Sequence, residues 1–148
     1  MRTILLGAAA IAALVMVQGS ALAADKLAYV DSQKVLDNFG KANANPLVPG
    51  GAYEVQTNRR VKNGNIEIHV KETDIFYVMD GSATLLMGGT AVEPRETRPN
   101  QMTAKDISAP EVHELKKGDV IVIPAGVPHW FKQVNGSIDY LVVKSKAP

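Results

Sequence analysis

The sequence predicts an all-β domain, an antiparallel sandwich or small barrel, preceded by one short helix. From residue 52 onward, short stretches of alternating or branched apolar residues follow one another. Gly, Asn, Asp and Pro turn formers separate them at close intervals. This spacing is typical of sandwiches and barrels. With 148 residues, the chain suits one domain, or one domain with an accessory segment, rather than two full cores.

The composition excludes several classes of site. Sixteen Lys and Arg residues face fifteen Asp and Glu residues, so no basic excess is available to bind a nucleic-acid backbone. The chain has no cysteine, which excludes disulfides, a thiolate nucleophile and Cys-based metal sites. Any metal or acid–base site must therefore use carboxylates and the three histidines, which are His69, His113 and His129.

Residues 1–23 have the pattern of a secretory signal peptide. Arg2 supplies a positive charge, an apolar run extends from Ile4 to Val17, and Ala21-Leu22-Ala23 ends in a small-x-small cleavage pattern. The apolar run is shorter than the ~20 residues that span a bilayer, and no stop-transfer cluster follows it. We expect cleavage after Ala23, a periplasmic or secreted protein, and no stable membrane anchor afterwards.

Residues 24–51 predict a helix followed by a linker arm. Asp31-Ser32 can cap a helix over residues 33–39, in which Val35, Leu36 and Phe39 would share an apolar face. The Asn-, Pro- and Gly-rich stretch at residues 41–51 favours an extended arm. The β domain then covers residues 52–148.

Within the β domain, the turn formers predict where strands end. Asn63-Gly64, Asp80-Gly81 and Asn135-Gly136 are hairpin signals. Residues 90–112 predict a loop with at most one short strand. The four branched residues of Val120–Ile123 predict a strand buried on both faces. Further strands are expected over residues 52–61, 65–70, 74–79, 83–87, 129–134 and 138–144.

Two segments carry polar side chains where strand parity turns them to one side. Glu67 and His69 are two residues apart, so they share a face of a strand. A bend at the polar residues 71–73 would let Asp74 face the same interior. In the second segment, a buried strand enters a Pro/Gly turn that presents His129 at the start of the next strand.

With these two segments, the sequence resembles the cupin superfamily, and within it the small single-domain type-2 barrels of jelly-roll architecture. The second segment matches the family's second motif, a Gly, five residues, Pro-x-Gly, two residues and His, at Gly118, Pro124, Gly126 and His129. The family's first motif reads His-x-His, three or four residues, Glu, six residues and Gly; here its positions hold Glu67, His69, Asp74 and Gly81. The resemblance covers about residues 52–143.

The resemblance implies a divalent metal ion, Mn²⁺, Fe²⁺ or Zn²⁺, whose ligands are Glu67, His69, Asp74 and His129. Members usually offer three histidines and one glutamate, so this chain departs from the pattern. Two carboxylates would neutralise the dication, which makes a weaker Lewis acid and a harder site that suits Mn or Fe. Activities of members with three histidines therefore do not transfer.

Other interpretations of these residues stay open. A second register would use His69 and Lys71 as the first pair, although a protonated lysine is a poor ligand. Glu67 and His69 could also lie on a solvent-facing edge strand. In a metal-free barrel, the four side chains would hydrogen-bond one another. His113 lies outside both motifs and is expected at the surface.

Strand parity predicts the lining of a pocket beside the metal: Phe76, Val78, Phe131 and Gln133. Tyr77 and Trp130 have the opposite phase and are expected outside the barrel or at a subunit contact. Because cupins often dimerise, a homodimer could cover exposed strand edges. Arg59-Arg60 could attract an anionic ligand to the mouth, although paired arginines are more often solvated.

The predicted function is that of an exported metal-binding cupin. As an enzyme it would act on a small organic molecule by oxygenase, isomerase or lyase chemistry, with a metal that polarises a substrate oxygen or binds dioxygen. Whether it is an enzyme stays open. The alternatives are a non-catalytic barrel that binds a small ligand and a structural protein stapled by its metal. No catalytic residue and no organic cofactor is assigned.

Overall fold

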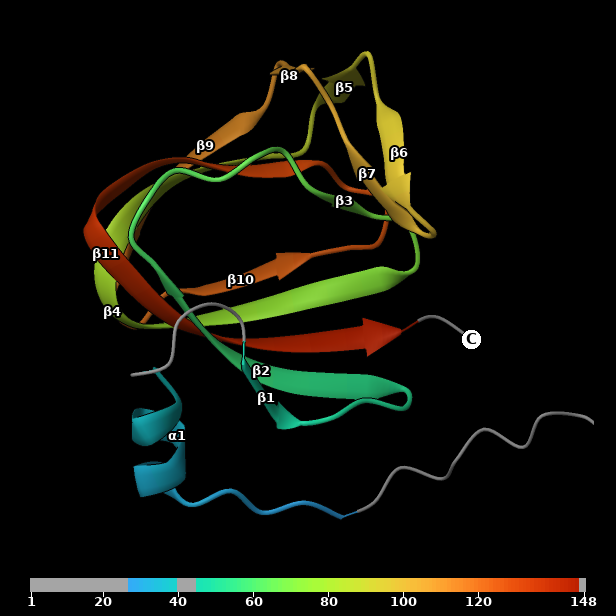
Figure 1. Cartoon of the computed structure of the whole chain (residues 1–148). Helices are drawn as coiled ribbons and strands as arrows, with labels where there is room; N and C mark the ends of the chain where they lie inside the picture. The colour runs from blue at the N-terminus through green and yellow to red at the C-terminus, as the bar shows by residue number, and fades with distance from the viewer. Residues whose placement is uncertain (1–26, 40–44, 147–148) are drawn as a thin grey trace, which may run out of the picture.

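The computed structural model describes residues 27–39 and 45–146, which fold into a curved, mostly β structure with one short helix at its side (Figure 1). The predicted signal peptide lies outside the described residues. The elements are α1 (Ser32–Phe39), β1 (Asn45–Val48), β2 (Tyr53–Arg60), β3 (Ile68–His69), β4 (Glu72–Met87), β5 (Thr90–Val92), β6 (Arg95–Arg98), β7 (Gln101–Thr103), β8 (Asp106–Ser108), β9 (Glu111–Lys116), β10 (Val120–Ile123) and β11 (His129–Lys146). The predicted all-β class is confirmed.

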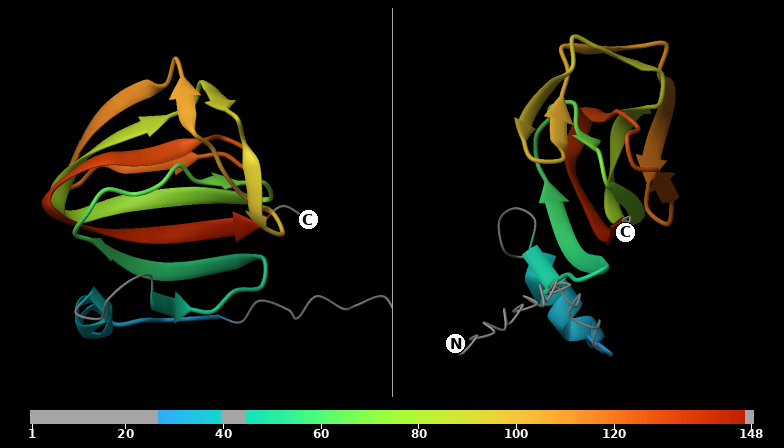
Figure 2. Two further views of the ribbon diagram at one scale, coloured as in Figure 1. Left: turned by 45° about the horizontal axis from the view of Figure 1, so that its top comes forward. Right: turned by 90° about the vertical axis from the view of Figure 1, so that its right-hand side faces the viewer.

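Two long strands organise the fold. β4 has 16 residues and β11 has 18, and the two pair antiparallel from Glu72 to Met87. They curve together, so that each contributes to two facing layers (Figure 2). The main sheet has the order β1-β2-β11-β4-β10, and β9 continues beyond β10 along β4. Two small sheets, β3-β7-β6 and β5-β8, complete the structure at one end.

Two of the predicted hairpin turns are bends inside these long strands. Gly81 lies opposite Ile138, and the register shifts between Val134 and Ile138, so that Asn135-Gly136 forms an irregularity in β11. Gly81 and Gly136 both have positive φ, 78° and 76°. A bent strand and a hairpin turn need the same left-handed residue, so the local signal does not distinguish them, and both predicted hairpins are wrong.

The hairpin predicted at Asn63-Gly64 is also wrong, because β2 pairs with β1 and β11 and not with the segment that follows it. That segment crosses over to the start of β11 instead. Gly64 N donates to Phe131 O at 2.9 Å, and Val134 N donates to Asn63 Oδ1 at 3.0 Å.

Three other predictions change. Residues 90–112 contain the four short strands β5–β8 and the start of β9. The arm before residue 51 includes β1, which pairs with β2. β10 is buried on one face only, since Val120 and Val122 are 64% and 52% exposed while Ile121 and Ile123 are buried. β10 is the last strand of the main sheet, and only its inner face meets the core.

The main core lies between the two layers and is built from β4, β9, β10 and β11. Its buried members are Phe76, Val78, Ala83, Leu85, Leu115, Ile121, Ile123, Phe131, Ile138, Tyr140 and Val142. A second cluster of Ile66, Ile68 and Ile107 packs under the small sheets. The inward side chains alternate along β4, as strand geometry requires.

The predicted short helix is confirmed as α1, which lies beside β1 and β2 (Figure 1). Asp31 caps it, because Oδ1 accepts from Lys34 N at 3.0 Å. Phe39 is buried and Asn38 Nδ2 donates to Thr57 Oγ1 at 2.9 Å, whereas Leu36 is 57% exposed and does not share the buried face. Among the residues described, α1 is too short and too polar to cross a bilayer.

We predict that Gly81→Ala destabilises the fold more than Gly136→Ala. A Cβ on Gly81 would overlap the backbone carbonyl of Ser137, whereas a Cβ on Gly136 meets open space. The control Gly136→Ala should cost only the left-handed strain of about 1–2 kcal/mol. Urea unfolding of both variants measures the difference; equal losses of unfolding free energy would show that the close approach of the two strands at the bend is unimportant.

Candidate metal centre

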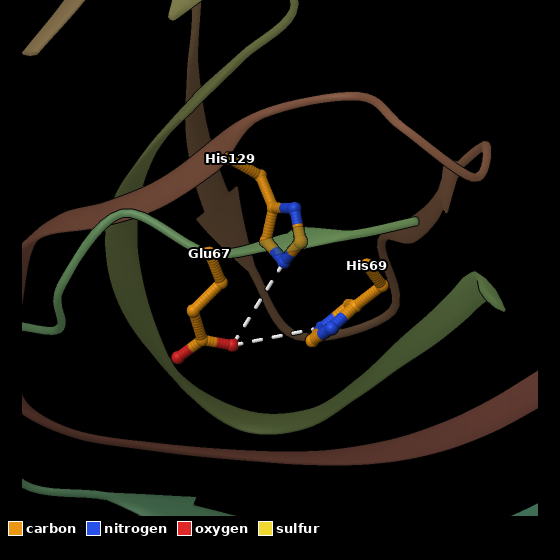
Figure 3. A group of neighbouring side chains, drawn as sticks. All are labelled: Glu67, His69 and His129. Carbon is orange, nitrogen blue, oxygen red and sulfur yellow. Dashed lines mark ion pairs between the residues drawn. The ribbon is translucent and has the colours of Figure 1, made fainter. Parts of the chain in front are cut away.

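A backbone bridge brings Glu67 and His129 together. Glu67 N donates to His129 O at 2.9 Å, and His129 N donates to Glu67 O at 3.0 Å. His69 follows on β3, where its carbonyl accepts from Gly126 N at 2.8 Å. Because Glu67 and His69 are two residues apart, their side chains project toward the same space as His129 (Figure 3).

The three side chains form a compact group of donor atoms. Glu67 Oε2 lies 3.7 Å from His69 Nε2 and 3.9 Å from His129 Nε2. One donor atom from each residue lies within 4.8 Å of the others. Two donors on one ion, each at about 2.0–2.2 Å, are at most about 4.4 Å apart, so the carboxylate already stands at suitable distances.

The outer nitrogen of each imidazole is fixed by a hydrogen bond. His69 Nδ1 bonds Gln101 Oε1, and Gln101 Nε2 donates to Glu72 Oε2 at 3.4 Å, which leaves Oε1 as an acceptor. His129 Nδ1 lies 3.2 Å from Val127 O. Both rings therefore carry a proton on Nδ1 and direct Nε2 toward the group. Metal-binding histidines are commonly oriented by such outer partners.

Within the described part of the chain, the inner nitrogens make no hydrogen bond. His69 Nε2 and His129 Nε2 are both buried, and they face carboxylate oxygens only at ion-pair distances of 3.3–3.9 Å. A buried polar atom without a partner costs about 1–3 kcal/mol. Two such atoms that face one carboxylate fit the donor set of a metal ion, which would satisfy both. Glu67, His69 and His129 could therefore hold a divalent metal.

Asp74, the fourth predicted ligand, stands beside this group but has another partner. Its Oδ2 lies 3.3 Å from His69 Nε2, while Lys144 Nζ donates to Oδ1 at 2.8 Å and to Oδ2 at 3.0 Å. The side chain of Asp74 is only 3% exposed. The structure thus places Asp74 next to the donors and ties both of its oxygens to an ammonium group.

The comparisons with known proteins agree with this architecture. The model of the family described as Cupin matches residues 49–148. The chain belongs to the cupin family. The predicted resemblance is confirmed, and it extends to the end of the sequence. A search of the curated proteins found no match.

Solved structures of low identity share the fold of this cupin. BH2720 from Bacillus halodurans has a TM-score of 0.57 at 18% identity, with 81% of this chain and 82% of that chain covered. A cupin-2 domain protein from Shewanella frigidimarina gives 0.53 at 15% identity, with 79% and 94% covered. An oxalate oxidase in complex with glycolate gives 0.51 at 18% identity, with 74% of this chain covered. The chain spans 57% of that oxalate oxidase and 51% of another match, the cysteine peptidase Peruvianin-I from Thevetia peruviana latex.

Burial and charge set the protonation of the cupin's polar interior. Burial alone would raise the pKa of Asp74, but His69 and Lys144 hold that pKa below its usual value, so the carboxylate is ionised. Burial works against protonation of His69, yet the adjacent Asp74 carboxylate raises the pKa of that imidazole. Burial lowers the pKa of His129. A metal would therefore displace a proton mainly from His69.

A cleft of about 490 Å³ opens onto the donor group. Glu67 and His69 form part of the wall of this cleft. A second cleft of about 560 Å³ shares both residues. Arg60 lines the first cleft, with its guanidinium 4.7 Å from the centre of the Phe131 ring and 3.5 Å from Glu67 Oε1. Tyr140 lies against the same guanidinium. The donor group is thus reachable by a small molecule.

Of the four residues predicted to line the pocket, Phe76 and Phe131 do so. Val78 is 1% exposed within the core. The prediction that Gln133 lines the pocket is wrong. Its side chain is exposed, and its Nε2 donates to Asn135 Oδ1 at 3.0 Å. A register shift between Phe131 and Gln133 breaks the alternation on which the prediction depended.

The remaining polar and aromatic candidates divide between surface and site. His113 is exposed and faces Glu111 at 3.2 Å, and Lys71 is exposed. Arg59 forms a two-fold ion pair with Asp139, at 2.7 and 2.5 Å, while Arg60 enters the cleft. Tyr77 is 45% exposed, as its phase predicts.

Trp130 was also expected outside the barrel or at a subunit contact. It is instead half-buried against the second apolar cluster, and Nε1 donates to Gly64 O at 2.7 Å. The crossing segment before β3 therefore covers a ring that alternation alone turned outward.

Sequence reasoning missed three residues of the site: Gln101, Glu72 and Lys144. Gln101 belongs to β7, in a region interpreted as a loop. Lys144 has the same parity as the buried Tyr140 and Val142, so a lysine at an inward position was the available signal. Its pairing with Asp74 follows from the register of β11 on β4, which local sequence does not reveal.

We predict that Tyr140 makes the cupin sensitive to alkaline pH. Burial raises the pKa of Tyr140 above its ordinary 10.0, although the charge of Arg60 opposes this. Above that pH the unfolded chain releases a proton that the folded chain retains, so stability falls as the pH rises. Urea unfolding of wild type and Tyr140→Phe between about pH 9 and 11 measures how the free energy of unfolding falls with pH. The variant should show a shallower decline, and equal slopes would contradict the prediction.

Proposed function

We propose that this cupin is a metal-dependent enzyme that binds a divalent ion through Glu67, His69 and His129 and acts on a small organic molecule. The observation that carries the proposal is the pair of buried, unpartnered Nε2 atoms that face one carboxylate. Neither a core cluster nor a surface ion pair requires two imidazoles to be oriented in this way. Asp74 lies beside these three donors, and its predicted role as a fourth ligand competes with its ion pair to Lys144.

The donor set favours iron or manganese. Two imidazoles and one carboxylate that leave coordination positions open are typical of non-haem Fe(II) oxygenases. A bound ion would supply Lewis-acid polarisation of a substrate oxygen or a site for dioxygen. An oxygenase is therefore the first reaction class to test, with isomerase and lyase chemistry next.

The cleft supports a substrate over a purely structural metal. Ligand pockets typically enclose about 300–1,000 Å³, and the cleft of about 490 Å³ falls in this range. Phe76 and Phe131 supply an apolar wall, while Asn58 and Gln56 supply polar contacts. Arg60 can orient an acidic or carbonyl group of the substrate beside the donors. A metal that only stapled the barrel would need no such opening.

Export and dimerisation extend the proposal. Residues 1–23 support a periplasmic or secreted enzyme through their signal-peptide pattern alone. A homodimer is supported by an exposed apolar strip of Ile75 and Tyr77 on β4 and Val120 and Val122 on β10. Face-to-face packing of the strips of two copies around a two-fold axis would cover both.

The first test is metal binding. Protein purified without chelator should contain close to one equivalent of Fe or Mn by elemental analysis. Glu67→Ala and His129→Ala should each lose the metal, since each removes a ligand, and the affinity should fall by more than the about 10–100-fold that outer-shell changes cost. Titration calorimetry of the metal-free proteins with Mn²⁺ measures the affinities.

His113→Ala and Lys71→Ala are the matched controls, because both residues are exposed and outside the donor group. Both variants should bind Mn²⁺ as wild type does. Loss of binding in Lys71→Ala would favour the rival register, and unchanged binding in Glu67→Ala and His129→Ala would overturn the assignment. A metal-loaded protein that turns over no small organic compound and consumes no oxygen would favour the non-catalytic barrel.

A second test concerns the dimer. Replacing Val120 and Val122 together by Lys should convert the dimer to a monomer in sedimentation equilibrium, because it places charges on the apolar strip. Val61, which is 65% exposed outside the strip, provides the control Val61→Lys. A monomeric wild type would refute the dimer.

A further inference from the structure

We propose that Lys144 is a positioning residue that holds Asp74 out of the coordination sphere, so that the metal has three protein ligands and one more open position than the motif implies. The inference rests on the proposed metal centre. It concerns a pair of residues that this chain places beside that centre.

The contact between Lys144 and Asp74 is close and uses both carboxylate oxygens of Asp74. Lys144 Nζ lies 2.8 Å from Oδ1 and 3.0 Å from Oδ2, so one ammonium binds both carboxylate oxygens. The side chains are only 16% and 3% exposed. Removing one partner from a buried pair leaves an uncompensated charge and is costly, so neither group is free to leave without a replacement.

The sheet register fixes this pair. Lys144 on β11 lies directly opposite Asp74 on β4, within the longest ladder of the fold. Directly opposed side chains on antiparallel strands remain in contact. Glu72 is a second carboxylate near the ammonium, with its Oε2 3.7 Å from Nζ. Lys144 therefore pairs with two carboxylates on the same strand.

The consequence for the metal follows from the position of Asp74 relative to the three donors. The mutually close donors are Glu67, His69 and His129, and Asp74 is not among them. Its Oδ2 nevertheless lies only 3.3 Å from His69 Nε2, which places it within reach of an ion bound there. Asp74 must give up its bonds to Lys144 before it can bind the metal well. With the lysine in place, water or substrate takes that position.

Replacing Lys144 by Met tests this directly, because Met keeps much of the length and removes the charge. In Mn²⁺-loaded protein, ¹⁷O-water ENDOR counts the water molecules on the ion. We expect Lys144→Met to lose one water, since the released Asp74 takes its place, and to bind Mn²⁺ about 10-fold or more tightly. Asp74→Asn in the wild-type background should leave the water count unchanged.

The double variant Lys144→Met with Asp74→Asn should regain the wild-type water count, because no carboxylate remains to bind. Lys146→Met is the matched control: Lys146 lies two residues along the same face of β11 and is exposed. It should change neither water count nor affinity. Circular dichroism melting verifies that each variant folds. If Lys144→Met does not fold, Lys144→Gln replaces it. The water count of Asp74→Asn still shows by itself whether Asp74 binds the metal.

The opposite pattern would overturn the proposal. If Asp74 already binds the metal in wild type, Asp74→Asn gains one water and Lys144→Met changes nothing. A wild type that binds no Mn²⁺ would instead refute the proposed function, so the two failures are distinguishable. A purely structural role for Lys144 would alter the melting temperature without altering the water count.

Discussion

The two backbone hydrogen bonds between Glu67 and His129 are the constraint on which the site depends. They join a short crossing segment to the first residue of the last long strand, and they set both side chains against the same interior. His69 is then placed by strand alternation from Glu67, and the bond from Gly126 N to its carbonyl holds it there. A donor group drawn from distant parts of the chain thus needs only a two-residue strand, β3, because its neighbours supply the rigidity.

That rigidity comes from the paired curve of β4 and β11. Gly81 allows the two strands to bend together while their ladder continues on both sides, which turns the start of β11 back over the sheet. Beneath the donors, Phe76, Phe131 and Tyr140 pack with ring centres 5.1–6.0 Å apart. Aromatic packing of this kind resists displacement, so the three packed rings support the imidazole of His129.

The sequence was informative where residue spacing carries the geometry, and misleading where pairing is decided at long range. The spacing from Gly118 to His129 describes one strand and one turn, so the motif could be identified without the fold. Asn135-Gly136 reports only that the backbone adopts positive φ, which a bent strand needs as much as a hairpin does. Gln101 and Lys144 reach the site through strand pairing, and neither could be placed before that pairing was known.

The ion pairs of the two carboxylates change how strongly these carboxylates would neutralise a bound metal ion. From the motif alone, Glu67 and Asp74 would neutralise a dication and weaken it as a Lewis acid. Each carboxylate, however, has an internal cation: Arg60 lies 3.5 Å from Glu67, and Lys144 binds Asp74 at 2.8 Å. Both cations are largely buried, so solvent screens them little. An ion held by Glu67, His69 and His129 would therefore keep more of its positive charge than the ligand count suggests, and the exchange of a histidine for Glu67 need not cost the site its ability to polarise a substrate.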